Sequence, residues 1–219
     1  MTGTTEPYLV LAEDGEAQVI EKKSRFIAIA KSVATHDAAI SYLEECKTRY
    51  WDATHHVYAY VLGEKGENLR YTDDREPPQT AGKPILDVIL GSKIRNVVVI
   101  VIRYFGGTLL GTGPLARAYA QAAKEALANA QIAHMVYGYT VTLIVPYPLL
   151  GKIQYEIRQR KLDPISIEYG ESVTIVLNVP ADASEAFKTS LDEATAGTIQ
   201  WHQSAGGYFE CRTRDFSES

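Results

Sequence analysis

The segment that most constrains the fold is an apolar run that leads into a glycine-rich turn. Residues 96–104, NVVVIVIRY, are β-branched and almost wholly apolar, which is typical of a strand buried on both faces. Four glycines follow within eight positions, and Pro114 stands where the first turn of a helix begins. The alanine-rich residues 115–130 then predict a helix that packs closely on a sheet. This order of strand, glycine turn and helix predicts an α/β arrangement.

The remaining pattern predicts two α/β domains. In the first, strands are expected at 18–23, 25–30, 55–63 and 96–104, helices at 36–50, 81–92 and 114–130, and a long polar loop at 63–80. In the second, strands are expected at 137–147, 163–170, 171–180 and 198–205, and helices at 148–161 and 182–194, with Asp182 as a helix cap. The second set has the β-α-β-β-α-β order of a ferredoxin-like fold. We therefore expect an N-terminal α/β domain at 1–134 and a ferredoxin-like domain at 135–219.

The composition excludes several classes of protein. A net charge of −5 gives no global basicity that would point to nucleic acid. Two distant cysteines, Cys46 and Cys211, predict neither a disulfide framework nor a zinc site. The N-terminus lacks the apolar segment of a signal peptide, and the longest apolar run, 97–102, is too short to cross a membrane. We expect a cytoplasmic protein with no membrane partner, no metal and no cofactor.

The glycine stretch lies in a basic segment of this acidic protein. Between residues 81 and 119, Asp87 is outnumbered by the cations Lys83, Lys93, Arg95, Arg103 and Arg117. A strand, a glycine turn and a helix start direct free N–H groups and the helix dipole toward one point, where an anion can bind. The candidate anion-binding or RNA-binding residues are Lys83, Arg103, Gly106, Gly107, Gly111, Gly113, Arg117 and Thr80, the last as the expected N-cap of the helix at 81–92.

Two interpretations of the glycine stretch remain open. Its spacing, GGxxxGxG, is neither the Rossmann fingerprint nor the P-loop. The glycines therefore either form an anion cradle or only allow the backbone to turn sharply.

Three acidic or imidazole side chains are secondary candidates. His55 and His56 are neighbours on a strand and point to opposite faces, so they cannot chelate one metal together. His55 has either a single functional role or a hydrogen-bonded structural one. Asp73 and Asp74 either hold a divalent cation or cap a turn and pair with a nearby arginine.

The second domain carries further cations, and no catalytic pair is recognisable. Lys152 and Arg158 belong to a basic helix that either contacts RNA or is a solvated face. Ser24, Ser92 and Cys46 have no recognisable base beside them, and no nucleophile elbow is present. A non-enzymatic role is therefore expected.

Four blocks of the sequence carry a resemblance to a known family. They are KKSRFIA (22–28), ATHHVYAY (53–60), DDREPPQTAGKPIL (73–86) and VIRYFGGTLLGTGPLARAY (101–119). Together they resemble the signature blocks of the YigZ/IMPACT family, whose bacterial branch has the same two-domain length. The chain departs from that pattern at Arg75 and Pro114, where glycine is common in the family, and near Pro78-Gln79, where smaller residues are usual.

The resemblance implies a fold and a role. The first domain would share the α/β fold of a ribosomal small-subunit protein domain and of GHMP-type kinases, and the second would resemble the last domain of elongation factor G. Eukaryotic members are similar to translational regulators that act through protein contacts during amino-acid starvation. The favoured hypothesis is a translation-associated regulator that binds RNA or the ribosome through the basic glycine-rich surface.

Two alternative functions stay open. One is an enzyme or sensor for a phosphorylated metabolite or nucleotide that uses the same glycine cradle, with a metal held by Asp73 and Asp74. The other is a protein-interaction module, in which the cradle is inert and a protein partner binds an exposed apolar patch.

Overall fold

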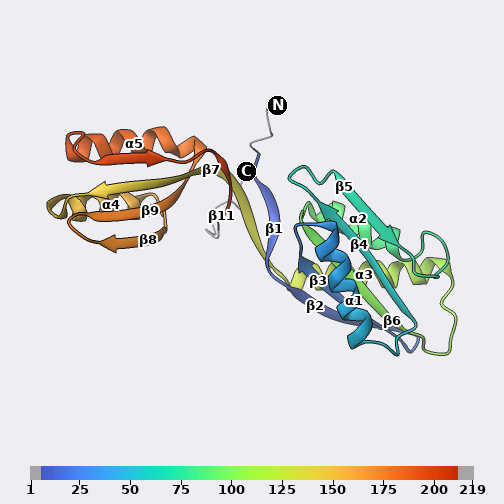
Figure 1. The fold of residues 1–219 in the computed structure, drawn as a ribbon. Helices are drawn as coiled ribbons and strands as arrows, with labels where there is room; N and C mark the ends of the chain where they lie inside the picture. Colours follow the sequence, from blue (N-terminus) through green and yellow to red (C-terminus); the bar gives the residue numbers. More distant parts are fainter. Residues whose placement is uncertain (1–5, 212–219) are drawn as a thin grey trace. The chain divides into compact units, whose positions relative to one another are not determined.

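A computed structural model describes residues 6–211 and confirms the α/β fold class (Figure 1). These residues divide into two compact units, one formed by Tyr8–His134 and the other by 135–211 together with Glu6 and Pro7. The chain passes from the first unit to the second within a single long strand, β7 (Gln131–Val145).

The first unit is built on a five-stranded sheet in which every neighbouring pair is antiparallel. Across the sheet the order is β2 (Gly15–Glu21), β3 (Ser24–Ser32), β6 (Val97–Tyr104), β4 (His55–Leu62) and β5 (Asn68–Thr72). The register places Arg103 of β6 opposite Phe26 on one side and His55 on the other. Three blocks that are distant in sequence therefore meet at the end of β6.

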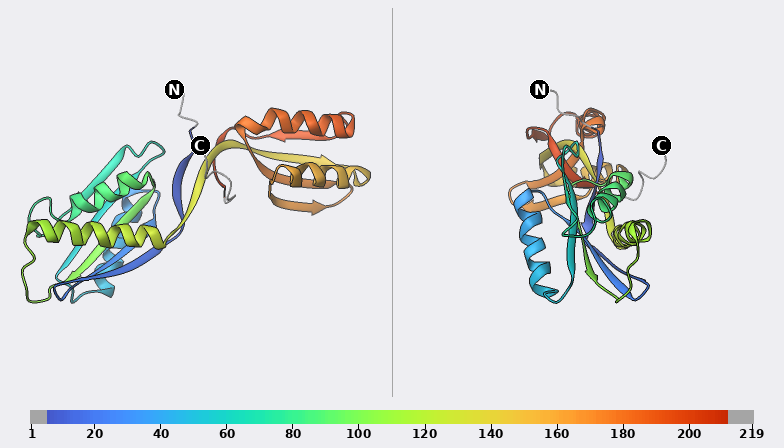
Figure 2. Two further views of the ribbon diagram at one scale, coloured as in Figure 1. Left: turned by 180° about the vertical axis from the view of Figure 1, so that it is seen from behind. Right: turned by 90° about the vertical axis from the view of Figure 1, so that its right-hand side faces the viewer.

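Helices cover both faces of this sheet (Figure 2). The helix α1 (His36–Arg49) packs on one face, and α2 (Gly82–Ser92) and α3 (Thr112–Asn129) pack on the other. Side chains of β6 alternate between the two cores, and all of those from Val97 to Ile102 have 0% exposure. The prediction of a strand buried on both faces is confirmed, and small alanines bring α3 close to the sheet.

The second unit has the predicted β-α-β-β-α-β order. After β7 come a short 3-10 turn (Tyr147–Leu149), α4 (Leu150–Gln159), β8 (Pro164–Tyr169), β9 (Val173–Pro180), α5 (Ala181–Thr195) and β10 (Gln200–Gln203). The sheet order β10-β7-β9-β8 is that of a ferredoxin-like fold. One core joins both helices to the sheet through Ile153, Ile157, Phe187 and Leu191.

Several expectations about local structure were wrong. The expected loop at 63–80 contains the strand β5, whose residues are mostly exposed because β5 is the sheet edge, so hydrophobic periodicity gave no signal. Asp182 is not a cap: α5 begins after Pro180, and Asp182 lies inside its first turn. Two strands, β1 (Tyr8–Glu13) and β11 (Gly207–Cys211), were not predicted.

Candidate functional site

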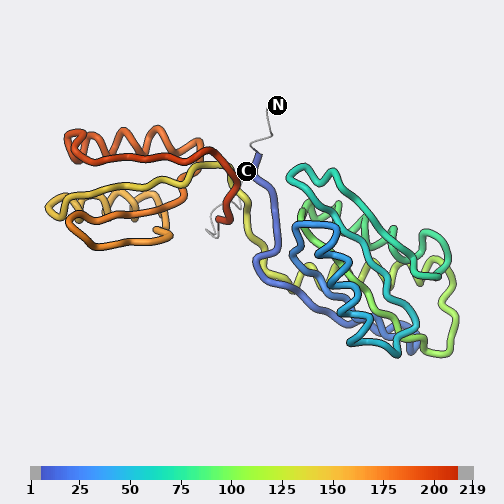
Figure 3. The backbone as a smooth tube through the Cα atoms, in the orientation of Figure 1, coloured from blue at the N-terminus to red at the C-terminus, as the bar shows by residue number. Residues whose placement is uncertain are grey.

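Three connections of the first unit meet at one end of its sheet, as the backbone trace shows (Figure 3). They are the β2–β3 turn at 22–23, the α1–β4 loop at 50–54 and the glycine loop at 105–111, and we call this region the loop end. Hydrogen bonds hold the three together. The N–H of Phe105 donates to Thr54 Oγ1 (3.2 Å), and the N–H of Gly106 donates to Ser24 Oγ (3.2 Å).

The glycines of the loop serve its backbone in two different ways. Gly106 lies so close to the β2–β3 turn that an added Cβ would overlap the backbone of Lys23 and Ser24. Gly107 and Gly111 have φ values of 79° and 78°, in the left-handed region that favours glycine. Gly111 precedes α3, whose first turn has no acidic residue and no side-chain cap. The N–H groups at this helix start are therefore not capped by a side chain of the described residues.

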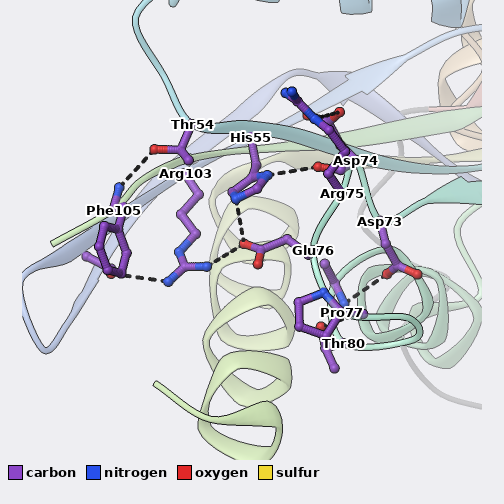
Figure 4. A network of polar contacts seen from close by, with 12 residues as sticks. Thr54, His55, Asp73, Asp74, Arg75, Glu76, Pro77, Thr80, Arg103 and Phe105 are labelled. Atoms are coloured by element: carbon purple, nitrogen blue, oxygen red, sulfur yellow. Dashed lines mark hydrogen bonds and ion pairs between the residues drawn. The ribbon is translucent and has the colours of Figure 1, made fainter. Parts of the chain in front are cut away.

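A buried polar cluster lies beneath the loop end, and we call it the Glu76 cluster (Figure 4). Oε1 of Glu76 accepts hydrogen bonds from Arg103 Nη1 (2.5 Å) and from the Tyr119 hydroxyl (2.7 Å). The Nε2 atom of His55 lies 3.7 Å from the same oxygen. Burial, followed by the Glu76 carboxylate, raises the pKa of Tyr119 well above its usual value, so the phenol stays a donor. One carboxylate thus joins β4, β6 and α3.

Arg103 does not present a free charge to an anion, contrary to the expectation from sequence. Its exposure is 5%, and its guanidinium group pairs with Glu76 and lies 3.4 Å from Ser24 Oγ. The guanidinium carbon also lies 5.4 Å from the ring centre of Phe26 and 5.7 Å from that of Phe105. The count of charges over residues 81–119 misled because Glu76, the partner of Arg103, lies just outside that window.

Lys83 and Thr80 also lie differently from the expectation. Lys83 pairs with Asp87 one turn along α2, so its charge is balanced locally. Thr80 is not the N-cap of α2, because its hydroxyl donates to the carbonyl of Pro77 (2.6 Å) and the helix begins after Ala81. The structure therefore does not bring Lys83, Thr80 and Arg103 together as one anion site.

Asp73 caps α2 in place of Thr80. Its Oδ1 accepts from the N–H groups of Ala81 (3.1 Å) and Gly82 (2.8 Å), and its Oδ2 accepts from that of Gln79 (2.8 Å). A carboxylate at a helix N-terminus satisfies free donors and is favoured by the helix dipole. This start of a helix is therefore already occupied by an anion from the chain itself.

Asp74 and His55 tie the segment that follows β5 to strand β4. Asp74 Oδ2 accepts the N–H of His56 (2.6 Å), and the Asp74 carbonyl lies 2.8 Å from His55 Nδ1. Arg75 has a φ of 69°, in the left-handed region. Both aspartates thus bind backbone groups.

Lowering the pH is expected to destabilise the first unit through His56. Burial lowers the pKa of His56, while the Tyr50 carbonyl, 3.1 Å from Nε2, opposes that shift. The unfolded chain then binds the proton more readily, so the stability is fully present above the unfolded pKa of about 6.5 and is lost as the pH falls through the folded value. The urea unfolding midpoint should therefore fall less for His56→Gln than for the wild type when the pH is lowered from near neutral to about pH 5. Equal losses in both proteins would contradict this.

The accessible cations at the loop end are mostly ones that the charge count did not include. Lys22 and Lys23 form the β2–β3 turn and are exposed, with φ values of 44° and 69°. Among the described residues, neither lysine has a carboxylate within ion-pair distance. The guanidinium carbon of Arg25 lies 4.3 Å from the ring centre of Tyr104. Arg117 of α3 is exposed and lines a surface hollow with Glu21.

Exposed apolar side chains accompany these cations, and they were not predicted from the sequence. Trp51 is 81% exposed in the α1–β4 loop, and Phe105 is 47% and Leu109 86% exposed in the glycine loop. The Tyr104 hydroxyl donates to Asp52 Oδ1 (2.8 Å) and so ties the loop that carries Trp51 to the end of β6. The sequence feature that could have indicated an exposed ring is a tryptophan within a polar, turn-like segment, YWDAT (50–54).

The basic helix of the second unit is α4, and part of its charge is engaged locally. Lys152 Nζ donates to the carbonyl of Ala194 (3.1 Å), and Arg160 pairs with Glu156. Arg158 is exposed near the end of the helix.

The structure shows neither an activated nucleophile at Ser24 nor a metal-ligand cluster among residues 6–211. Ser24 is fully buried, and its Oγ is met by two donors, Arg103 Nη2 and the Gly106 N–H, instead of a base. Within residues 6–211, no three or more His, Cys, Asp or Glu side chains are grouped so that they could hold a metal ion. None of the helices in this part of the chain is long and apolar enough to cross a membrane.

Comparison with protein families identifies the class to which this chain belongs. Residues 22–127 match the model of the Impact N-terminal domain, and residues 143–198 match a domain of unknown function, DUF1949. The IMPACT family member YvyE of Bacillus subtilis is 32% identical over 97% of this chain and 98% of its own length. YigZ of Escherichia coli is 33% identical over 82% of this chain and 89% of its own length. This chain belongs to the IMPACT family.

A eukaryotic relative and a solved structure extend the comparison. The Protein IMPACT homolog of Dictyostelium discoideum is 37% identical over 42% of this chain and 28% of its own length. A crystal structure described as that of an hypothetical protein is 31% identical and covers 90% of this chain and 97% of its own, with a TM-score of 0.60. The resemblance drawn from the four sequence blocks is confirmed.

Proposed function

We propose that this protein is a non-enzymatic, translation-associated regulator that binds RNA, free or on the ribosome, through the loop end. The observation that carries the proposal is the β2–β3 turn. Lys22 and Lys23 are exposed and unpaired among the described residues, and Gly106 fixes their turn against the glycine loop. This arrangement supports contact with a polyanion, although the whole protein is acidic.

The surroundings of the turn support the same partner. The cations Arg25, Arg49 and Arg117 lie on the elements that lead into or out of the loop end, together with the carboxylates of Glu21 and Asp52. Backbone N–H groups at the start of α3 add donors without charge. Cations and N–H groups position phosphates without reading sequence, so we expect weakly specific and salt-dependent binding.

The proposal keeps the partner expected from the sequence but changes the residues that bind it. Arg103 becomes a support for the surface, because it is buried with Glu76, and Lys83 is paired on α2. Lys22 and Lys23 replace them as the charges that contact phosphate. The carboxylates of Asp73 and Asp74 accept backbone N–H groups, which gives the alternative of a metal-dependent phosphate enzyme no specific support.

Reversing both charges of the β2–β3 turn tests the proposal. In Lys22→Glu/Lys23→Glu, we expect ribosome co-sedimentation at low salt to fall at least about tenfold, because each lost phosphate contact weakens binding and lowers its salt dependence. Both side chains are exposed, so thermal stability should change little.

The matched control reverses two exposed charges of the second unit. Arg158→Glu/Lys188→Glu makes the same change in net charge away from the loop end and should leave co-sedimentation close to that of the wild type. Equal losses in the two double variants would show that only net charge matters. Unchanged association of Lys22→Glu/Lys23→Glu at every salt concentration would refute the proposal.

A further inference from the structure

The loop end exposes aromatic rings as well as charges, and phosphate binding alone does not account for the rings. Trp51 is 81% exposed and Phe105 is 47% exposed, whereas aromatic side chains ordinarily contribute to the core. Both rings are carried by connections anchored at the end of β6. Asp52, next to Trp51, accepts the Tyr104 hydroxyl at 2.8 Å, and Thr54 accepts the N–H of Phe105 at 3.2 Å.

The rings and the cations belong to the same small set of segments. The guanidinium group of Arg25 lies over the Tyr104 ring, and the backbone of Lys23 lies against Gly106, the residue after Phe105. Arg49, at the end of α1, has its guanidinium carbon 5.0 Å from the ring centre of Tyr50, the residue before Trp51. Cations thus lie on segments that adjoin each exposed ring.

Exposed rings among cations distinguish between forms of RNA. In a duplex the bases are already stacked on one another, and the major groove is too deep and narrow for side chains to enter. In a single strand the base faces are free and stack on aromatic side chains, while nearby cations bind the backbone. Stacking tolerates any base, so we expect little preference for base sequence.

We infer that the loop end binds single-stranded RNA, with unpaired bases stacked on Trp51 and Phe105 and phosphates on Lys22 and Lys23. This inference rests on the proposed function and narrows its ligand to unpaired RNA. A protein partner with an apolar surface is the competing occupant. The cations around the rings favour RNA, because an apolar partner would leave them desolvated and unpaired.

Tryptophan fluorescence gives a direct readout of the stack. The chain has two tryptophans, Trp51 and Trp201, and Trp201 packs against Phe187 in the second unit, with ring centres 5.8 Å apart. In a Trp201→Phe variant all tryptophan emission comes from Trp51. Titration with a short oligouridine should quench that emission saturably, and a duplex of equal length should quench it little.

Affinity measurements with end-labelled RNA complete the test. Trp51→Ala should weaken binding of the single strand by about tenfold and leave duplex binding unchanged. Tyr155→Ala, which removes a ring that is 54% exposed on α4, is the control and should change neither.

The outcomes separate the two proposals. If single strand and duplex bind equally and Trp51→Ala weakens neither, while Lys22→Glu/Lys23→Glu weakens both, the inference is overturned and the proposed function stands. If neither RNA binds and no ribosome association occurs, the proposed function fails and the inference fails with it.

Discussion

Replacing Glu76 by alanine is expected to lower the free energy of unfolding by about 3–5 kcal/mol, because it leaves the buried charge of Arg103 without a counterion. The carboxylate is the shared acceptor of Arg103 and Tyr119 and lies near His55, and it is itself only 7% exposed. Among the described residues, Nε of Arg103 already has no hydrogen-bond partner. Removing the Glu76 carboxylate would therefore leave a second group of this side chain without an acceptor. Urea unfolding followed by circular dichroism would measure the loss.

Two further variants give this prediction its controls. Asp87→Ala breaks the exposed pair with Lys83 and should cost less than about 1 kcal/mol. The double variant Glu76→Ala/Arg103→Met removes the buried charge as well, so it should be more stable than Glu76→Ala alone. If Glu76→Ala cost no more than Asp87→Ala, the Glu76 cluster would not be the support of the loop end.

Gly106→Ala is expected to destabilise the protein by about 3 kcal/mol and to weaken RNA binding at the same time. The new methyl group would overlap the backbone of Lys23 and Ser24, so either the glycine loop or the β2–β3 turn must move. Movement of that turn displaces Lys22 and Lys23, which we propose as the phosphate-binding charges. Thermal unfolding and ribosome co-sedimentation would record both effects.

The same substitution in open space is the control for Gly106→Ala. Gly91 lies within α2, and a Cβ added there would meet nothing within 4 Å. Gly91→Ala should therefore stabilise the helix by about 0.5–1 kcal/mol and leave RNA binding unchanged. A Gly106→Ala protein as stable as the wild type would show that the close approach of the two turns is not needed.

The strands and helices of the core could be predicted because their burial follows their sequence period. The run at 97–102 is apolar at every position because each face of β6 meets a helix layer. The alternation of strands and helices after residue 135 gave the ferredoxin-like order directly. The edge strand β5 was missed because most of its side chains are exposed and carry no such period.

Of the candidate site, the sequence indicated the glycine loop and its cations but not which charges the fold leaves accessible. The four glycines follow β6 as expected, but pairing across the sheet decides which charges remain accessible. Glu76 lies 27 positions before Arg103 in the chain and neutralises it, and the paired register brings Ser24 beside Gly106 across 82 positions. A count of charges over a short stretch of sequence cannot reveal such contacts. The cations of the KKSR segment were visible in the sequence, and only the fold places them against the glycine loop.

The central claim is that RNA contacts the loop end, and mapping of ultraviolet cross-links tests it most directly. RNA would be cross-linked to the protein in gently lysed cells, and the modified peptides would be identified by mass spectrometry. We predict cross-links within residues 22–25, 50–54 and 103–111, with Trp51 and Phe105 among the modified positions. Cross-links confined to α4, or no cross-links in the first unit, would contradict the account.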